Sequence, residues 1–285
     1  MSPTPRAPLR RNVRGRAGPA ESVPWPAHLP LARGLRPRTR MKWIIAGLMV
    51  ALPFAAGSVA HAQSSPKDTP WSAEFAIGWD NSISGNINSS GIGTLNGQAV
   101  VITKNTYDDV YGTGLHIRFG GGYLLDDFTE VRATFSFQSL DADLTPMGDI
   151  GVSRLYGQYD DYKSFGLDVG FRRYVDLQPG LRAYGEGTLG LAFIEETDVT
   201  LVAPGANFTG DVTDFYDQTA AFTLGGNAGV VLQMSSNIDM FGQVGIRWVS
   251  GMSAIDNLEG TGLETINDKS GRWTMPFLTG VRVRF

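Results

Sequence analysis

Ionisable residues recur at alternate positions along several stretches between Glu74 and Arg284, and they are the residues of this chain best suited to chemistry. We call them the polar set: Glu74, His116, Arg118, Glu130, Arg132, Asp168, Arg172, Arg182, Glu186, Asp239, Arg247, Arg282 and Arg284. A spacing of two places neighbouring members on the same face of a β-strand. If strands enclose that face, carboxylates and guanidinium groups would neutralise one another as salt bridges. The functional alternative is a polar path for ions, and we favour the salt-bridge network.

His116 is the one histidine after residue 62, so histidine-based acid–base or acyl-transfer chemistry would have to use it. It stands in the sequence His116–Ile117–Arg118, on the polar side of its stretch. We expect it to pack in the interior, and we predict no catalytic site and no cofactor.

Acidic groups offer the other candidate chemistry. Asp108–Asp109, Asp160–Asp161 and the group Asp211, Asp214 and Asp217 could hold Ca²⁺. None of them has the spacing of an EF-hand loop. We therefore interpret them as solvated loop charges. The chain contains no cysteine, which excludes a disulfide scaffold and the common Cys-based metal sites.

The elements that position these residues are predicted to be strands. Apolar and polar side chains alternate, with the period of a two-faced strand, over residues 71–79, 111–125, 128–139, 165–172, 181–193, 222–233, 239–248 and 277–285. Long polar loops are expected near 81–110, 140–163, 196–218 and 250–272, and short turns near 126–127, 176–180 and 235–237. Ala99–Ile102 could extend a hairpin or, as an alternative, add strands.

The length of these strands indicates a membrane protein. Soluble strands average about 5–6 residues, whereas tilted strands of about 9–11 residues cross a bilayer. Hydrocarbon tolerates only closed hydrogen bonding, so apolar-out, polar-in strands must form a barrel. We predict an all-β fold, an eight-stranded antiparallel up-and-down transmembrane β-barrel over residues 71–285; ten strands and a soluble β-sandwich are the alternatives. Interfacial girdles are predicted from Trp71, Trp79, Tyr111, Tyr123, Trp248 and Trp273.

The chain before residue 71 has a different composition. Residues 1–40 contain nine Arg, eight Pro and one Glu, so we predict a disordered head that results from a mis-assigned start, rather than a nucleic-acid-binding arm. Residues 41–62 combine Lys42, a short apolar run and small residues. This pattern is typical of a secretory signal peptide, cleaved here after Ala62, and its apolar run is too short for a membrane-spanning helix. Residues 63–70 form a polar leader.

The last strand carries apolar residues on one face, Phe277, Val281 and Val283, and Phe285 is the final residue. This ending resembles the C-terminal assembly signal of bacterial outer-membrane β-barrels. Residues 71–285 as a whole resemble the small eight-stranded outer-membrane barrels, the group that includes the OmpA transmembrane domain, OmpX and the opacity proteins. We do not expect the peptidoglycan-binding domain of full-length OmpA.

The resemblance implies a non-enzymatic protein of the outer membrane of a Gram-negative bacterium, with a structural or surface-interaction role for its long outward-facing loops. Its implied partners are outer-membrane lipid and lipopolysaccharide, the barrel-assembly machinery, periplasmic chaperones and an extracellular ligand that the sequence does not identify; nucleic acid is not expected. The alternatives are a narrow pore for small solutes and, less favoured, a lipid A-modifying barrel enzyme. Some enzymes of that kind use a His-x-Ser pattern, which His116–Arg118 does not meet.

Overall fold

A computed structural model gives the structure of residues 70–254, 256–267 and 271–285. The predicted head, the signal peptide with its cleavage after Ala62, and residues 63–69 of the polar leader lie outside these described residues. No helix in the described part of the chain is long and apolar enough to cross a membrane.

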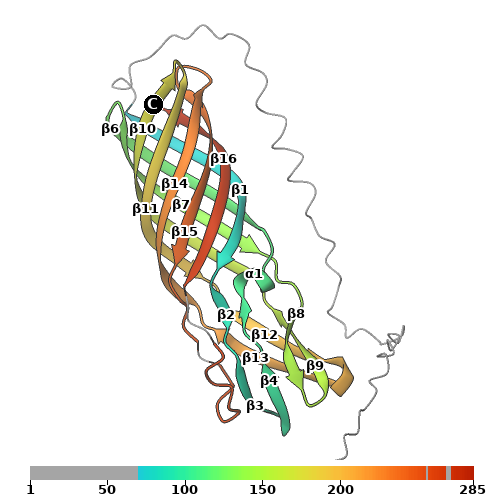
Figure 1. The fold of residues 1–285 in the computed structure, drawn as a ribbon. Coiled ribbons are helices and arrows are strands. Elements are labelled where there is room, and N and C mark those ends of the chain that lie inside the picture. The colour runs from blue at the N-terminus through green and yellow to red at the C-terminus, as the bar shows by residue number, and fades with distance from the viewer. Residues whose placement is uncertain (1–69, 255, 268–270) are drawn as a thin grey trace, which may run out of the picture. The chain divides into compact units, whose positions relative to one another are not determined.

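Eight antiparallel strands close into a barrel (Figure 1). They are β1 (Trp71–Ser84), β6 (Gly114–Asp126), β7 (Thr129–Leu140), β10 (Tyr162–Gln178), β11 (Leu181–Ile194), β14 (Thr219–Gln233), β15 (Ile238–Val249) and β16 (Arg272–Arg284). Each strand pairs with its predecessor and successor around the barrel, and β1 pairs with β16 to close it. The predicted fold class, an eight-stranded antiparallel up-and-down barrel, is confirmed.

The alternation in the sequence becomes the two sides of the barrel wall. In β1, Glu74 is buried and lies opposite Arg282, whereas the next residue, Phe75, points outward and lies opposite Val281. A shift of one residue would turn every side chain of the strand to the other side, so the alternation fixes the register.

The first residue of β1 and the last residue of the chain meet at the seam between β1 and β16. The Phe285 amide donates to the Trp71 carbonyl at 3.0 Å, and the Trp71 amide donates to the Phe285 carbonyl at 3.2 Å. Phe285 is therefore a hydrogen-bonded part of the barrel wall. We call this end, where the short turns lie, the short-turn end.

The segments at the other end, the long-loop end, are largely ordered. Six strands form a second sheet, the cap sheet, in the order β13 (Phe208–Tyr216), β12 (Thr197–Ala203), β9 (Ser153–Tyr159), β8 (Thr145–Ile150), β4 (Gln98–Ile102) and β3 (Gly91–Leu95). Three shorter elements join it to the barrel, β2 (Asn86–Asn88), β5 (Asn105–Thr106) and α1 (Tyr107–Val110), and the 3-10 turn η2 (Pro204–Ala206) connects β12 to β13 within it. Figure 1 shows the cap sheet continuing beyond the barrel.

The cap sheet corrects the prediction of long polar loops. Its inner face carries a hydrophobic core that extends into the long-loop end of the barrel and includes Val100, Ile102, Val199 and Leu201. These residues occupy alternate positions within β4 and β12, so each strand has one apolar side. The suggestion that Ala99–Ile102 extends a hairpin is confirmed, because β4 pairs with β3 outside the barrel.

Candidate functional site: the sealed barrel interior

Arg172, on β10, lies at the centre of the barrel and is fully buried. Its Nη1 contacts Glu74 Oε1 at 2.7 Å, and its Nη2 contacts Glu186 Oε2 at 2.6 Å. Its guanidinium also lies 4.1 Å from the centre of the Tyr184 ring. One cation therefore joins carboxylates from β1 and β11 across the lumen, which explains why a charge is tolerated there.

Arg132, on β7, contacts the same two carboxylates from the other side. Its Nη1 is 2.9 Å from Glu186 Oε2, and its Nη2 pairs with Glu74. The side chains of Arg132 and Glu186 are fully buried. Two guanidinium groups and two carboxylates thus form a closed square that fills the cross-section of the barrel.

A second layer lies toward the short-turn end and is organised by Glu130. Ser72 Oγ donates to Glu130 Oε1 at 2.6 Å, the Tyr174 hydroxyl donates to Glu130 Oε2, and Arg282 donates to the Tyr174 hydroxyl. Arg282 Nη2 also contacts Asp239 Oδ2 at 2.7 Å. The last strand is thereby tied to β7, β10 and β15 by charged and hydroxyl groups.

Glycines make room for these bulky side chains. A Cβ on Gly122 would lie 2.0 Å from Glu130 Oε1, and a Cβ on Gly229 would lie 2.5 Å from the Tyr184 ring. Both glycines stand on strands beside the network. The abundance of glycine in these strands is therefore explained in part by the close approach of interior side chains to the backbone.

A third layer lies toward the long-loop end. Arg118 Nη2 donates to Gln243 Oε1 at 2.7 Å, and Gln243 Oε1 also accepts from the Tyr184 hydroxyl at 2.8 Å. Asp168 pairs with Arg247 at 3.2 Å and accepts from the Thr223 hydroxyl at 2.6 Å.

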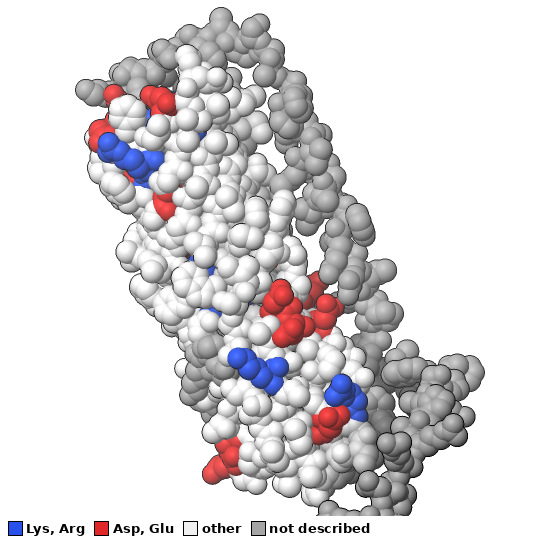
Figure 2. Space-filling view, in the orientation of Figure 1, with Lys and Arg blue, Asp and Glu red and all other residues white. Residues whose placement is uncertain are grey.

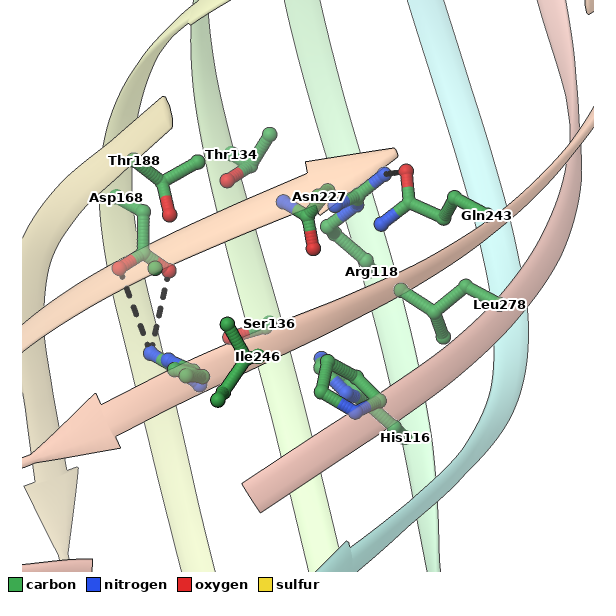
Figure 3. Close-up of a pocket in the computed structure, with 13 residues that line it drawn as sticks. His116, Arg118, Thr134, Ser136, Asp168, Thr188, Asn227, Gln243, Ile246 and Leu278 are labelled. Atoms are coloured by element: carbon green, nitrogen blue, oxygen red, sulfur yellow. Dashed lines mark hydrogen bonds and ion pairs between the residues drawn. The ribbon is translucent and has the colours of Figure 1, made fainter. Parts of the chain in front are cut away.

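His116 shares with this layer a small cavity of about 30 Å³ (Figure 3). The cavity is also lined by Arg118, Ser136, Asp168 and Gln243. His116 is buried, and neither of its ring nitrogens has a hydrogen-bond partner among the described residues.

The structure places the predicted polar set inside the barrel with one exception. Buried inside are Glu74, His116, Arg118, Glu130, Arg132, Asp168, Arg172, Glu186, Asp239, Arg247, Arg282 and Arg284. Arg182 instead lies at the rim of the short-turn end, where its Nε contacts Asp176 at 2.9 Å and the guanidinium donates to the Asp127 carbonyl. Its guanidinium also stacks 4.4 Å from the centre of the buried Tyr174 ring, so Arg182 lies on the predicted polar side of the wall but is only partly buried, at the mouth of the lumen.

Several interior residues were not predicted. Asp80, Gln138 and Arg272 form a fourth layer, in which Gln138 Nε2 donates to Asp80 at 2.6 Å and Arg272 donates to Gln138 at 3.5 Å. Asp80 and Arg272 fell outside the predicted strands because β1 and β16 extend further than their alternation indicates. Gln138 lies on the polar face of its strand, but it is uncharged and was therefore not included in the polar set of ionisable residues.

The hydrophobic core of the cap region covers this fourth layer. The Arg272 guanidinium stacks 4.0 Å from the centre of the Tyr162 ring, where the charged lumen meets the apolar core. Beyond it lie Tyr111 and Tyr159, whose hydroxyls donate to the Asp160 carbonyl and to Asn88 Oδ1. Burial raises the pKa of both phenols, so they remain neutral hydrogen-bond donors.

The outer wall of the barrel is apolar. Exposed aliphatic and aromatic side chains surround it: Phe75, Ile77, Phe119, Val131, Phe135, Phe165, Leu167, Val169, Phe171, Leu189, Leu191, Phe193, Phe222, Leu224, Val230, Leu232, Val244, Ile246, Val281 and Val283. Figure 2 shows charged side chains gathered toward the two ends of the wall, with a largely uncharged surface between them. Soluble monomers do not expose a continuous apolar band of this kind.

Aromatic residues mark both edges of this band. Trp71 and Tyr123 pack edge to face at the short-turn end, next to Phe285. Trp248 and Trp273 pair across β15 and β16 at the long-loop end. Tyr111 is a correction to the predicted girdle: it is buried in the core of the cap region, because the chain before β6 folds inward instead of starting a strand.

The acidic groups have local structural contacts. Asp109 accepts from the backbone amide of Thr106, the N-cap residue of α1, in a capping box, and Asp211 accepts from the Thr200 hydroxyl at 2.9 Å. The Asp214 amide donates to Asp198. Within the described ranges, no group of three or more His, Cys, Asp or Glu side chains is arranged to hold a metal ion.

Comparisons with known proteins give structural matches only. No protein-family model matches the chain, and no curated protein matches it. Among solved structures, Neisserial surface protein A is 14% identical, with 75% of this chain and 96% of that chain covered and a TM-score of 0.38. Ail of Yersinia pestis is 12% identical, with 76% and 100% covered and a TM-score of 0.33. The outer-membrane protease OmpT of Escherichia coli is 10% identical, with 80% and 99% covered and a TM-score of 0.38. This chain is similar to those outer-membrane barrels at a level that carries no statement about its role.

Proposed function

We propose that the protein is a non-enzymatic barrel of the outer membrane of a Gram-negative bacterium, which holds its cap sheet outside the membrane for contact with other molecules. The observation that carries the proposal is the contrast between the two sides of the wall. The outside is an apolar band, and the inside is a nearly neutral set of buried ion pairs. Only lipid makes this arrangement favourable on both sides.

The height of the apolar band supports a position in a bilayer. Trp273 and Phe285 are twelve residues apart on the last strand. That separation corresponds to about 40 Å along a strand, or about 30 Å along the membrane normal at a tilt of ~40°. Outer-membrane barrels have an apolar band about 25 Å tall between aromatic girdles. The height of about 30 Å calculated for this strand is therefore close to the height that is typical of outer-membrane barrels.

The filled lumen favours a binding or structural role over a pore. An open recess of about 700 Å³ enters from the short-turn end and ends at Asp239, Arg282 and Arg284. Beyond them lie the layers organised by Glu130 and Arg172, and then the apolar core of the cap region. An ion crossing the barrel would have to break buried ion pairs, which costs several kcal/mol for each pair.

The position of His116 argues against lipid A chemistry. His116 and Ser136 line the same cavity, but both are buried inside the barrel wall. A lipid acyl chain would reach the outer side of the wall, so it would meet the exposed apolar residues instead. Catalysis requires a group within hydrogen-bond reach of its substrate.

The cap region supplies the surface for contact. The four segments beyond the barrel strands, residues 85–113, 141–161, 195–218 and 250–271, contain seventeen Asp or Glu and three Lys or Arg. Such a surface attracts cationic partners and repels polyanions at low ionic strength. The external ligand that we propose is therefore positively charged. Outer-membrane lipid and lipopolysaccharide would surround the band, and Phe277, Val281, Val283 and Phe285 would act as the signal for the barrel-assembly machinery after delivery by periplasmic chaperones.

Membrane location and surface binding are tested together by expressing residues 41–285 in a Gram-negative host. We expect the protein in the outer-membrane fraction, with faster gel mobility before boiling than after. Whole cells should then retain a fluorescent polycationic peptide more than cells that carry the variant with Asp108→Asn, Asp149→Asn and Glu196→Gln, three exposed acidic residues of the cap region. Recovery of the protein as a soluble periplasmic monomer would contradict the proposal.

A further inference from the structure

One buried guanidinium group of the barrel is only weakly paired, and it lies next to the interior cavity. Among the described residues, the buried cations are Arg118, Arg132, Arg172, Arg247, Arg272, Arg282 and Arg284, and the buried anions are Glu74, Asp80, Glu130, Asp168, Glu186 and Asp239. Three of these groups, Asp239, Arg282 and Arg284, line the open recess at the short-turn end, where solvent can screen them. Deeper in the barrel, a charge without a close partner is costly, so the pairing of each cation there matters.

The contacts leave one of these cations weakly paired. Arg132, Arg172, Arg282 and Arg284 contact the carboxylates of Glu74, Glu130, Glu186 and Asp239, four against four. Arg247 pairs with Asp168, and Arg272 reaches Asp80 through the Gln138 amide. Arg118 remains: its one ion pair in the described structure is a 3.9 Å contact with Glu186, which already contacts Arg132 and Arg172.

Arg118 lines the cavity together with donors that are not used elsewhere. Figure 3 shows His116, Ser136 and Gln243 around the same space as Arg118. Neither His116 ring nitrogen, nor Ser136 Oγ, nor Gln243 Nε2 has a hydrogen-bond partner in the described part of the chain. All three side chains are more than nine-tenths buried. A neutral imidazole, a hydroxyl and an amide can each donate one bond to an anion.

The size of the cavity limits the ligand. A volume of about 30 Å³ exceeds the 10–15 Å³ that one water molecule requires. The cavity is therefore large enough for a small anion such as a halide. Asp168 also lines the cavity, but its two oxygens are directed to Arg247 and Thr223.

From the weak pairing of Arg118, the unused donors and the cavity, we infer that the barrel holds one halide ion, chloride under physiological conditions, bound by Arg118, His116, Ser136 and Gln243. The ion neutralises Arg118 and stabilises the folded barrel. The layer of Asp80, Gln138 and Arg272 and the apolar core above it separate the site from the long-loop end. The ion therefore enters during folding and exchanges slowly.

The direct test is crystallography with bromide. The mature protein is refolded into detergent in sodium bromide, or in sodium gluconate as the control, and anomalous differences are measured at the bromine absorption edge. We expect one anomalous peak within contact distance of Arg118 and Gln243 in the bromide crystals. Ordinary electron density of water at that position, without an anomalous peak, would overturn the inference.

Thermal unfolding gives an independent test in solution. Protein refolded in chloride should unfold at a midpoint about 2–4 °C higher than protein refolded in gluconate at equal ionic strength, because an anion present at a few times its dissociation constant stabilises only the folded state. Arg118→Gln should remove this chloride-dependent shift. Arg154→Gln is the matched control, because Arg154 lies on the exposed cap sheet and pairs with Asp149, and it should leave the shift intact. Equal midpoints for the unmodified protein in the two salts would contradict the inference even if Arg118→Gln failed to fold.

Discussion

Replacing Arg172 by Met is the sharpest test of the interior network. The substitution keeps most of the side-chain volume and removes the charge. Glu74 and Glu186, which Arg172 contacts at 2.7 and 2.6 Å, would then share Arg132, and the only other cation paired with either of them in the described structure would be Arg118, 3.9 Å from Glu186. The side chains of Arg172 and Glu186 are fully buried and that of Glu74 is nearly so, and solvent therefore cannot replace the missing cation.

The expected loss follows from the cost of an unpaired buried charge. Removal of one partner of a buried ion pair destabilises a protein by about 3–5 kcal/mol. Since Arg132 still contacts both carboxylates, we expect a value near the lower limit, about 3 kcal/mol. Adding Glu186→Gln to the variant removes one of the two stranded charges, so the double variant should recover about 1 kcal/mol or more relative to the sum of the single changes.

Urea titration of the refolded protein in lipid vesicles, followed by tryptophan fluorescence, measures these free energies of unfolding. Arg154→Met is the matched control: its ion pair with Asp149 spans 3.4 Å and both side chains are more than half exposed, so the loss should stay below about 1 kcal/mol. If Arg172→Met lost no more than this control, and the double variant showed no recovery, the network would not be dry and the reasoning from buried ion pairs would be refuted.

Three further outcomes are expected. Val169→Arg on the outer wall should lower the free energy of unfolding in vesicles by about 2–4 kcal/mol, because its guanidinium group would face the bilayer midplane. A loss below about 0.5 kcal/mol would show that this face does not contact lipid. Deleting Phe285 should leave protease-sensitive chains in the periplasm, because the backbone bonds that close the seam to Trp71 are lost; normal insertion, scored by cell fractionation, would contradict that role. Planar bilayers containing the protein should show no steady conductance, and steady channels would favour a pore. Leu140→Ala opens a cavity in the buried core at the long-loop end, at a cost of about 2–5 kcal/mol. This variant should therefore show brief channel openings more often than the unmodified protein.

The barrel was predictable because its signal is local. Alternation with a period of two fixes which side of a strand is buried, and a closed antiparallel arrangement follows from membrane physics. The interior positions of Glu74, Arg132 and Arg172 follow from the same rule. Which guanidinium contacts which carboxylate was not predictable, since that depends on the tilt and stagger of the strands around the closed barrel.

The errors lie where the barrel ends. Arg182 alternates like an interior residue, but the periodic pattern does not show where the lumen opens to solvent, and the side chain lies at the rim. Asp80 and Arg272 are one residue or more beyond the alternation that marked their strands, although both point inward. Tyr111 looked like an interfacial residue because it precedes a strand, yet it packs in the apolar core of the cap region.

Strands of the cap sheet such as β12 have buried positions and outward-facing positions, and these differ in how well they tolerate substitution. In β12, Val199 and Leu201 are buried in the core, whereas the alternating residues Thr200 and Val202 face partly outward. Substitution of a buried member opens a cavity, which typically costs 2–5 kcal/mol for Leu→Ala, whereas most surface substitutions stay within about 0.5 kcal/mol. An irregular loop offers no such division, since a change in any residue can alter its shape. The outward residues of the cap sheet can therefore be substituted at little cost in stability while the inward ones keep the core closed, which would let the proposed binding surface change without opening the lumen.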